Sequence, residues 1–148
     1  MRRRTAIAIA ATGLILDQAV KQFFLHSQNP ESGFFLIPDV LGIRMHLNAQ
    51  FALSIPFPNS AAAVLMLLVI AGIAAAFLNF PAVRSGCGVW LVLAGALSNF
   101  ADRVIYGGVV DYIAVAWGGV FNLADVLIIF GIILMVLPHP SLTHGKLP

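Results

Sequence analysis

The stretch AAAVLMLLVIAGIAAAFL, residues 61–78, contains no charged side chain. A helix of about 20 mostly apolar residues is long enough to cross the hydrocarbon core of a bilayer. Three further apolar runs lie on either side of it, at residues 5–25, 86–104 and 120–137. The sequence therefore predicts an all-α membrane protein with four transmembrane helices, built as a single integral membrane domain over residues 1–148.

The composition of the whole chain points to the same class of protein. Hydrophobic residues make up 60% of the sequence and charged residues 9%, whereas a soluble domain has about 25% charged residues. So few charges could not cover a compact soluble globule with polar groups. The 8 lysines and arginines are also too few for a phosphate-binding surface. The composition excludes a soluble enzyme, a disordered chain and a nucleic-acid-binding protein.

Basic residues predict how the chain is oriented. Arg2, Arg3 and Arg4 precede the first apolar run, and basic residues favour the cytoplasmic side of a membrane. Four spans then return the C-terminus, with Lys146, to the cytoplasm. A basic start followed by an apolar run also resembles a signal peptide, but no convincing Ala-x-Ala site follows, so we expect a retained first span. All acidic residues then fall in outer half-spans or outer loops: Asp17, Glu31, Asp39, Asp102, Asp111 and Asp125.

Two segments join the spans on the outer side. Residues 26–58 contain many prolines and glycines, and Ile43–Asn48 alternates between apolar and polar residues as a half-buried strand does. Gly33–Ile37 could pair with it, so we expect a small extracytoplasmic β-sheet between spans one and two. Residues 105–119 are shorter and rich in glycine, and Tyr112 is among the aromatic residues there that suit a membrane interface.

Polar residues interrupt the first and third spans at helical spacing. Asp17 and Lys21 are four residues apart and share a helix face, which is most simply explained by an ion pair. Asn99 and Asp102 are three residues apart, and Arg103 follows them. A helix-end anchor with a snorkelling arginine would explain this second group without any function. Charges in a membrane cost free energy and are rare unless they are paired or used.

The fourth span repeats the Asn-x-x-Asp spacing in Asn122 and Asp125. Asn122 could be the N-cap of that helix, with Asp125 in its first turn, and Asp111 could be an ordinary loop aspartate. Together, however, these carboxylates lie at one depth with few basic partners. Two adjacent carboxylates share one proton and could activate a water molecule, as in an aspartic protease. A nucleophilic Ser54 or Ser98 is not supported, because neither has a histidine at a plausible depth.

Four segments resemble the motifs of one known family in order and spacing. They are Leu16–Lys21 (LDQAVK), Gly95–Arg103 (GALSNFADR), Val109–Ile113 (VVDYI) and Phe121–Asp125 (FNLAD). Across nearly its whole length the chain thereby resembles lipoprotein signal peptidase, the type II signal peptidase of bacteria.

This resemblance implies a membrane aspartic endopeptidase of the bacterial inner membrane. Such an enzyme removes signal peptides from diacylglyceryl-modified prolipoproteins by cutting before the lipidated cysteine. The resemblance implies a β-cradle in the outer segment, no metal and no organic cofactor, and we expect a monomer in the lipid bilayer. The implied catalytic residues are Asp111 and Asp125. The implied supporting residues are Asp17, Lys21, Asn48, Asn99, Asp102, Arg103 and Asn122.

The sequence departs from the family pattern at a few positions, and two alternative functions are considered beside the peptidase. Gln50 and Leu53 replace a glycine and an aromatic residue of the motif around Asn48, and Ser98 replaces a glycine. One alternative is a paralogue that binds lipoproteins without cleaving them, against which the intact aspartates argue. The other is a small proton-coupled transporter. Transporter sites lie near the membrane midplane in broken helices, whereas Asp125 lies close to the start of its span.

Overall fold

The computed structural model describes residues 3–27, 33–49, 58–81, 83, 86–116 and 119–137. Its long helices follow the predicted spans closely. They are α1 (Arg3–Leu25), α2 (Asn59–Asn79), α4 (Gly88–Tyr106) and α5 (Leu123–Val136). The first three are long and apolar enough to cross a membrane, and α5 is a shorter apolar helix of 14 residues. The apolar run at 120–137 is longer than α5 because its first residues form a strand and an N-cap instead.

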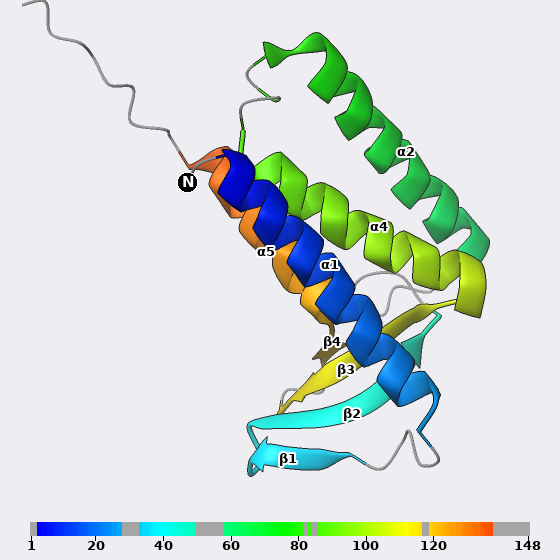
Figure 1. Ribbon diagram of the computed structural model, residues 1–148. Helices are drawn as coiled ribbons and strands as arrows, with labels where there is room; N and C mark the ends of the chain where they lie inside the picture. Colours follow the sequence, from blue (N-terminus) through cyan, green and yellow to red (C-terminus); the bar gives the residue numbers. More distant parts are fainter. Residues whose placement is uncertain are drawn as a thin grey trace, which may run out of the picture.

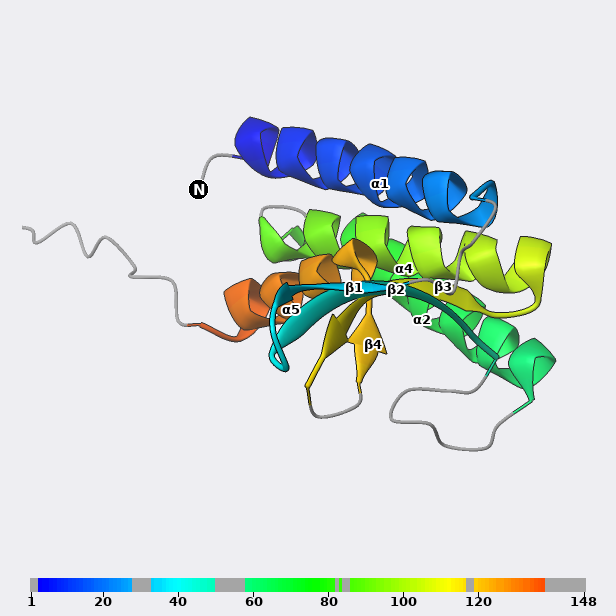
Figure 2. The same cartoon turned by 90° about the horizontal axis from the view of Figure 1, so that it is seen from below.

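Helix α4 lies between the other helices and contacts α1, α2 and α5 (Figures 1 and 2). A buried apolar cluster joins three of them: Ala10, Leu91, Ala94 and Leu127. Small residues let α4 and α5 approach closely, as is common between helices in membranes. A Cβ added at Gly95 would collide with the backbone carbonyl of Ala124 on α5. This close contact fixes the start of α5 against the middle of α4.

The four strands form one antiparallel sheet in the order β1-β2-β3-β4. They are β1 (Phe34–Ile37), β2 (Leu41–Asn48), β3 (Val109–Val115) and β4 (Val120–Phe121). The predicted pair within residues 26–58 is confirmed as β1 and β2. Residues 105–119 differ from the expected loop because they supply β3, which pairs along most of β2. The sheet therefore joins the segment after α1 to the segment after α4.

The connection from α4 to β3 brings two parts of the polar cluster together. Helix α4 ends at Gly107, whose φ of 76° is a left-handed conformation that glycine adopts without steric cost. The chain then reverses into β3 after one further residue. In consequence Asp102, in the last turns of α4, accepts a hydrogen bond of 3.1 Å from the backbone N–H of Val110 on β3.

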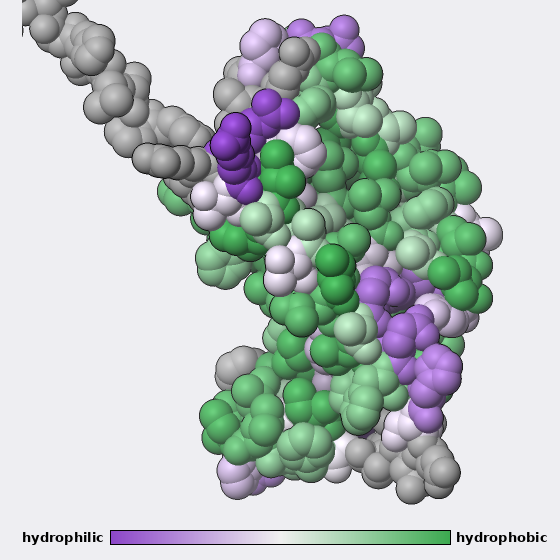
Figure 3. Space-filling model, in the orientation of Figure 1, coloured by the Kyte–Doolittle hydropathy of each residue, from purple (hydrophilic) through white to green (hydrophobic). Residues whose placement is uncertain are grey.

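The surface of the molecule is apolar along the helices (Figure 3). Helix α2 exposes most of its length, including Val64, Leu65 and Leu68, while Ala62 is buried against the bundle. A hydrophilic patch marks the N-terminal end of α1 in Figure 3, and the sheet lies at the opposite end of the helices in Figure 1. An apolar surface along long helices is the pattern of a protein that crosses a bilayer.

Candidate active site

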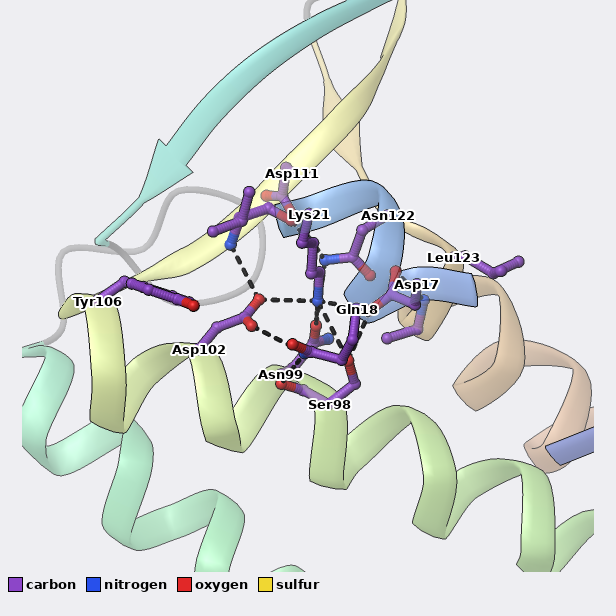
Figure 4. A network of polar contacts seen from close by, with 12 residues as sticks. Asp17, Gln18, Lys21, Ser98, Asn99, Asp102, Tyr106, Asp111, Asn122 and Leu123 are labelled. Atoms are coloured by element: carbon purple, nitrogen blue, oxygen red, sulfur yellow. Dashed lines mark hydrogen bonds and ion pairs between the residues drawn. The ribbon is translucent and has the colours of Figure 1, made fainter. Parts of the chain in front are cut away.

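Lys21 lies at the centre of a buried network where α1, α4, β3 and α5 meet (Figure 4). Its Nζ is 2.6 Å from Asp17 Oδ2 and 2.7 Å from Asp102 Oδ2, and all three side chains are fully buried. Lys21 Nζ also donates to Asn99 Oδ1 at 3.0 Å. The predicted pair of Asp17 and Lys21 is therefore present, and Asp102 joins it. A buried charge is tolerated when it is paired and hydrogen-bonded in this way.

Ser98 and Gln18 complete the hydrogen bonding around this ion cluster. Ser98 Oγ donates to Asp17 Oδ2 at 2.6 Å. Gln18 Nε2 donates to Ser98 Oγ at 2.8 Å and to Asp102 Oδ1 at 3.0 Å. The hydroxyl of Ser98, one of the departures from the family pattern, thus takes part in the network. Gln18 was not predicted as a site residue, although its position directly after Asp17 was a signal that could have identified it.

Tyr112 connects the ion cluster to the start of α5. Its Oη donates to Asp17 Oδ1 at 3.0 Å and accepts from the backbone N–H of Leu123 at 3.1 Å. Asp17 Oδ1 also accepts from the backbone N–H of Ala124 at 3.2 Å. Tyr112 is 5% exposed, so its side chain packs inside the protein and not on its surface. Its hydroxyl finds buried partners, and burial beside the negative charge of Asp17 raises its pKa.

Asn122 caps α5 and at the same time bridges the other polar residues. Its Oδ1 accepts from the backbone N–H of Asp125 at 2.9 Å, and Asp125 Oδ2 accepts from the backbone N–H of Asn122 at 3.3 Å, which forms a capping box. The Nδ2 of Asn122 donates to Asp111 Oδ1 at 2.7 Å and to Asn99 Oδ1 at 3.1 Å. Asn99 Nδ2 in turn donates to Asp125 Oδ1 at 2.8 Å. The capping geometry and the bridging role therefore coexist.

Asp111 lies on β3 with 2% of its surface exposed. Its Oδ1 accepts from Asn122, and its Oδ2 accepts from Asn48 Nδ2 on β2 at 3.2 Å. Burial, followed by the negative charge of Asp125, raises the pKa of Asp111 to about 7. The two amide donors and Lys21 favour the carboxylate but do not offset burial. Asp111 can therefore hold or release a proton near neutral pH, which is what general acid–base catalysis needs.

Arg103 links the site to the start of α2. Its Nη1 donates to Asn59 Oδ1 at 3.0 Å, and Asn59 Nδ2 donates back to the Arg103 carbonyl at 3.0 Å. The guanidinium lies within electrostatic range of Asp111 and Asp125. Asn59 was missed because it stands apart from the motifs, as the first residue of an apolar helix. Arg103 thus connects α4 to the start of α2 but is 5% exposed, so it does not extend to the membrane surface as a snorkelling arginine would.

The structure brings every predicted site residue into this one region. One group surrounds Lys21, a second connects Asp111 and Asp125 through Asn122, and Asn99 contacts both. Gln50, Leu53 and Ser54 lie outside the described residues. Among the residues that the structure describes, no group of three or more His, Cys, Asp or Glu could hold a metal ion. The arrangement offers the buried carboxyl group of Asp111, the partly buried one of Asp125, amide donors and a nearby cation.

The sequence matches a known protein family and several of its members. The family described as signal peptidase (SPase) II matches residues 9–139. A lipoprotein signal peptidase of Rhodococcus jostii is 33% identical over 91% of this chain and 72% of its own length. One from Syntrophomonas wolfei is 37% identical over 84% and 85% of the two chains. One from Staphylococcus aureus is 30% identical over 96% and 91%.

Solved structures resemble the fold as well. A bacterial membrane enzyme determined by the in meso method at 2.3 Å resolution superposes with a TM-score of 0.76. It is 29% identical in sequence, and the match covers 92% of this chain and 90% of that one. A second such structure, at 1.9 Å resolution, gives a TM-score of 0.74 at 29% identity. Sequence and fold together lead to one conclusion: the chain belongs to the signal peptidase II family.

Proposed function

We propose that this protein is a membrane aspartic endopeptidase that removes signal peptides from diacylglyceryl-modified prolipoproteins, cutting before the lipidated cysteine. The observation that carries the proposal is the connection of Asp111 and Asp125 through Asn122, with Asn48 and Asn99 as their other amide donors. Membership of the signal peptidase II family supports a protease that acts on prolipoproteins in a membrane.

The catalytic step follows from two carboxyl groups that share one proton. The ionised aspartate removes a proton from water, and the resulting hydroxide oxygen forms a bond to the carbonyl carbon of the scissile peptide. The protonated aspartate gives its proton to the carbonyl oxygen. The aspartate that took the proton from water then donates it to the amide nitrogen, while the other aspartate removes a proton from one hydroxyl of the tetrahedral intermediate, and the carbon–nitrogen bond breaks. Since the aspartates titrate as a pair, the proton is assigned to the pair and not to one residue.

The remaining residues would hold this pair in place. Asn48 and Asn122 orient Asp111 through their amide groups, and Asn99 orients Asp125. Lys21, Asp17 and Asp102 fasten α1 to α4 and to the backbone of β3 and α5. These groups act as positioning residues: they hold the aspartates in one geometry before the substrate binds. Groups that are already oriented stabilise the charge of the transition state without having to rearrange.

The membrane placement is part of the same proposal. We propose one integral domain of the bacterial inner membrane, acting as a monomer, with both termini in the cytoplasm and the active site at the outer face. The basic residues Arg3 and Arg4 begin α1, and the sheet and the acidic cluster lie at its far end (Figure 1). The acyl chains of a lipidated cysteine in the outer leaflet would then hold the scissile bond at the depth of the aspartates.

Neither alternative function fits these observations as well. A transporter site is expected near the midplane in broken helices, but Asp125 is the third residue of α5, about 3 Å from its start at 1.5 Å per residue. A paralogue without activity has no need for a buried carboxylate whose pKa lies near 7, as that of Asp111 does.

The test is cleavage of a diacylglyceryl-modified prolipoprotein by the purified protein in detergent. We expect the parent to cleave, and Asp111→Asn and Asp125→Asn to lose at least about 100-fold in rate, the scale of a general acid–base contribution. Asp39→Asn is the matched control, because Asp39 is exposed in the turn before β2. Normal turnover by either active-site variant, with the parent active, would remove the assignment of that aspartate.

A further inference from the structure

We infer that His46, on β2, is an electrostatic positioning residue of the candidate active site. Its imidazolium charge stabilises the carboxylate form of Asp111 and extends cleavage to lower pH. The inference rests on the proposed function, since it concerns the ionisation of one of the two proposed catalytic aspartates. His46 belongs to none of the motifs that connect this chain to its family.

The pairing of β2 with β3 places His46 beside Asp111. The two residues are direct partners in the antiparallel register, and Asn48 is paired with Val109 in the same stretch. Direct partners in antiparallel strands point to the same face, with Cβ atoms about 4.5–5.5 Å apart. Residues two apart on a strand also share a face. His46 and Asn48 therefore lie on one face of β2.

The hydrogen bond from Asn48 to Asp111 identifies that face as the one that carries the site. Asn48 Nδ2 donates to Asp111 Oδ2 at 3.2 Å, so the side chains of Asn48 and Asp111 lie on the same side of the sheet. His46, directly across from Asp111, must lie on this side too. The irregularity in the β2–β3 pairing falls between Ile43 and His46, before this stretch, and leaves the argument intact.

His46 and Asp111 differ in how far they are exposed to solvent. Asp111 is 2% exposed, whereas His46 is an exposed residue. The imidazole therefore stands at the rim of the site, where it can exchange protons with water while its charge acts on a buried carboxyl group a short distance away. No other proposed site residue combines solvent access with a side chain that ordinarily changes its charge between pH 5 and 8.

Other charged groups also act on Asp111, and they come from each element around it. Asp125 begins α5, Lys21 projects from α1, and Arg103 projects from α4. On β2, Arg44 is the other ionisable residue. Lysine, arginine and aspartate side chains ordinarily keep their charge between pH 5 and 8. Apart from the two aspartates, His46 is thus the group among these whose charge ordinarily differs between weakly acidic and neutral pH.

The sign of the effect follows from the two charges. Burial raises the pKa of Asp111 to about 7, and a protonated imidazole opposes this by favouring the carboxylate. The pair then reaches its singly protonated form at lower pH than it would without the histidine. At separations of about 6 Å near a protein surface, a unit charge shifts a titration by roughly half a pH unit or more. The shift should shrink at high ionic strength, because His46 is exposed.

Two substitutions separate the charge of His46 from its shape. In His46→Gln the acidic limb of the pH–rate profile should move up by about half a pH unit, while the alkaline limb stays near that of the parent, where the histidine is already neutral. His46→Lys keeps a positive charge at all relevant pH values. In this variant the acidic limb should stay at the pH of the parent, and the alkaline limb should move to lower pH. His26→Gln is the matched control, since His26 is exposed just after the end of α1, is not part of β2, and its ring nitrogen hydrogen-bonds to the backbone carbonyl of Gln22.

A second readout does not depend on cleavage. The pH dependence of the unfolding midpoint reports the ionisation of Asp111, because the folded protein holds a proton on Asp111 that the unfolded chain releases. In His46→Gln this stabilisation should persist to a pH about half a unit higher than in His26→Gln. The difference between the two variants should vanish when both also carry Asp111→Asn.

The two proposals fail in different ways. A parent that cleaves, with acidic limbs that coincide in His46→Gln and His26→Gln, overturns the role of His46 and leaves the proposed function standing. A folded parent that does not cleave contradicts the proposed function, and the unfolding measurement then decides the role of His46 alone. Unfolding midpoints of His46→Gln and His26→Gln that coincide across the pH range overturn the electrostatic contact in either case.

Discussion

At the scale of single residues, Asn122 has two roles that are usually separate. Its Oδ1 caps α5 through the backbone N–H of Asp125, and its Nδ2 donates to Asp111 and Asn99. The spacing of Asn122 and Asp125 predicts the cap, and the cap is present. The bridge to Asp111 could not be derived from spacing, because it depends on where β3 lies. One amide group thus connects the start of a helix to a carboxyl group on a strand.

Substitutions of Asn122 should separate these roles. Asn122→Ser keeps a capping oxygen and loses the amide donor, so stability should stay near that of the parent while cleavage falls at least about 10-fold, which corresponds to one lost hydrogen bond to a charged group. Asn122→Ala should also lower the free energy of unfolding by about 1 kcal/mol through loss of the cap. Thermal unfolding in detergent and the cleavage rate measure the two effects.

The control for this series is Asn79→Ala. Asn79 Nδ2 donates to the backbone carbonyl of Ala75 at the exposed end of α2, far from the aspartates along the helix. Cleavage should be unchanged in this variant. If Asn122→Ser cleaves as fast as the parent, the amide bridge has no part in the reaction.

Asp111 should also make stability depend on pH. Its pKa is raised from 3.8 to about 7, so the folded protein holds a proton that the unfolded chain releases. The stabilisation is fully present below pH 3.8 and is lost as the pH rises through about 7. With 1.36 kcal/mol per pH unit, the parent should lose up to about 4 kcal/mol relative to Asp111→Asn across this range. Unfolding midpoints of both proteins from pH 4 to 8 measure the difference, and parallel curves would contradict it.

At the scale of elements, the contact between α4 and α5 determines how the two halves of the site meet. Asn99 lies four residues after Gly95 on α4, and Gly95 faces the backbone of Ala124, the residue before Asp125. A side chain at position 95 would push the start of α5 away from α4. The hydrogen bond of 2.8 Å between Asn99 and Asp125 depends on this close approach.

Gly95→Ala should therefore weaken both the fold and the activity. The added methyl group would meet the Ala124 carbonyl and come within 2.8 Å of Ile128 Cγ1. Overpacking of this kind costs about 1–3 kcal/mol, and the displaced aspartate should slow cleavage. Gly72→Ala is the matched control, since a Cβ there meets nothing within 4 Å. A Gly95→Ala protein with the unfolding midpoint and cleavage rate of the Gly72→Ala protein would refute the role of this contact.

The elements differ in how far the sequence alone could predict them. The helices α1, α2 and α4 follow from their long apolar runs, and β2 follows from its alternation. Strand β3 was missed because Val110, Asp111 and Tyr112 are all buried, which removes the alternation that marks a strand with one solvent face. Its partner β2 is also distant in sequence. The polar residues could be identified because burying them in a membrane costs free energy. Their pairing, such as that of Lys21 with Asp102, could not be predicted, because it depends on how α1 packs against α4.

At the scale of the whole molecule, α1 separates two chemically different ends. Arg3 and Arg4 begin it, and Lys21 and the polar cluster lie near its other end. Its 23 residues span about 35 Å at 1.5 Å per residue, enough for the hydrocarbon core of a bilayer. The proposed orientation follows if the basic end faces the cytoplasm.

Cysteine labelling in intact cells can measure this orientation. Thr5 and His26 are exposed at opposite ends of α1, and Cys87 is buried and can be replaced by alanine as a background. A membrane-impermeant maleimide should label His26→Cys in spheroplasts, and Thr5→Cys only after lysis. The opposite pattern would invert the proposed topology and place the aspartates in the cytoplasm.

The sheet also has a consequence for biosynthesis. Strand β2 leaves the ribosome before α2 and α4, but its partner β3 is translated after them. The hydrogen bond from Asn48 to Asp111 and the ion pair of Lys21 with Asp102 therefore cannot form until α4 and β3 have been translated. Asp125 arrives last, with α5. Until α5 has been inserted, the chain lacks Asp125 at the site, so competence to cut should begin only when this helix has reached its place.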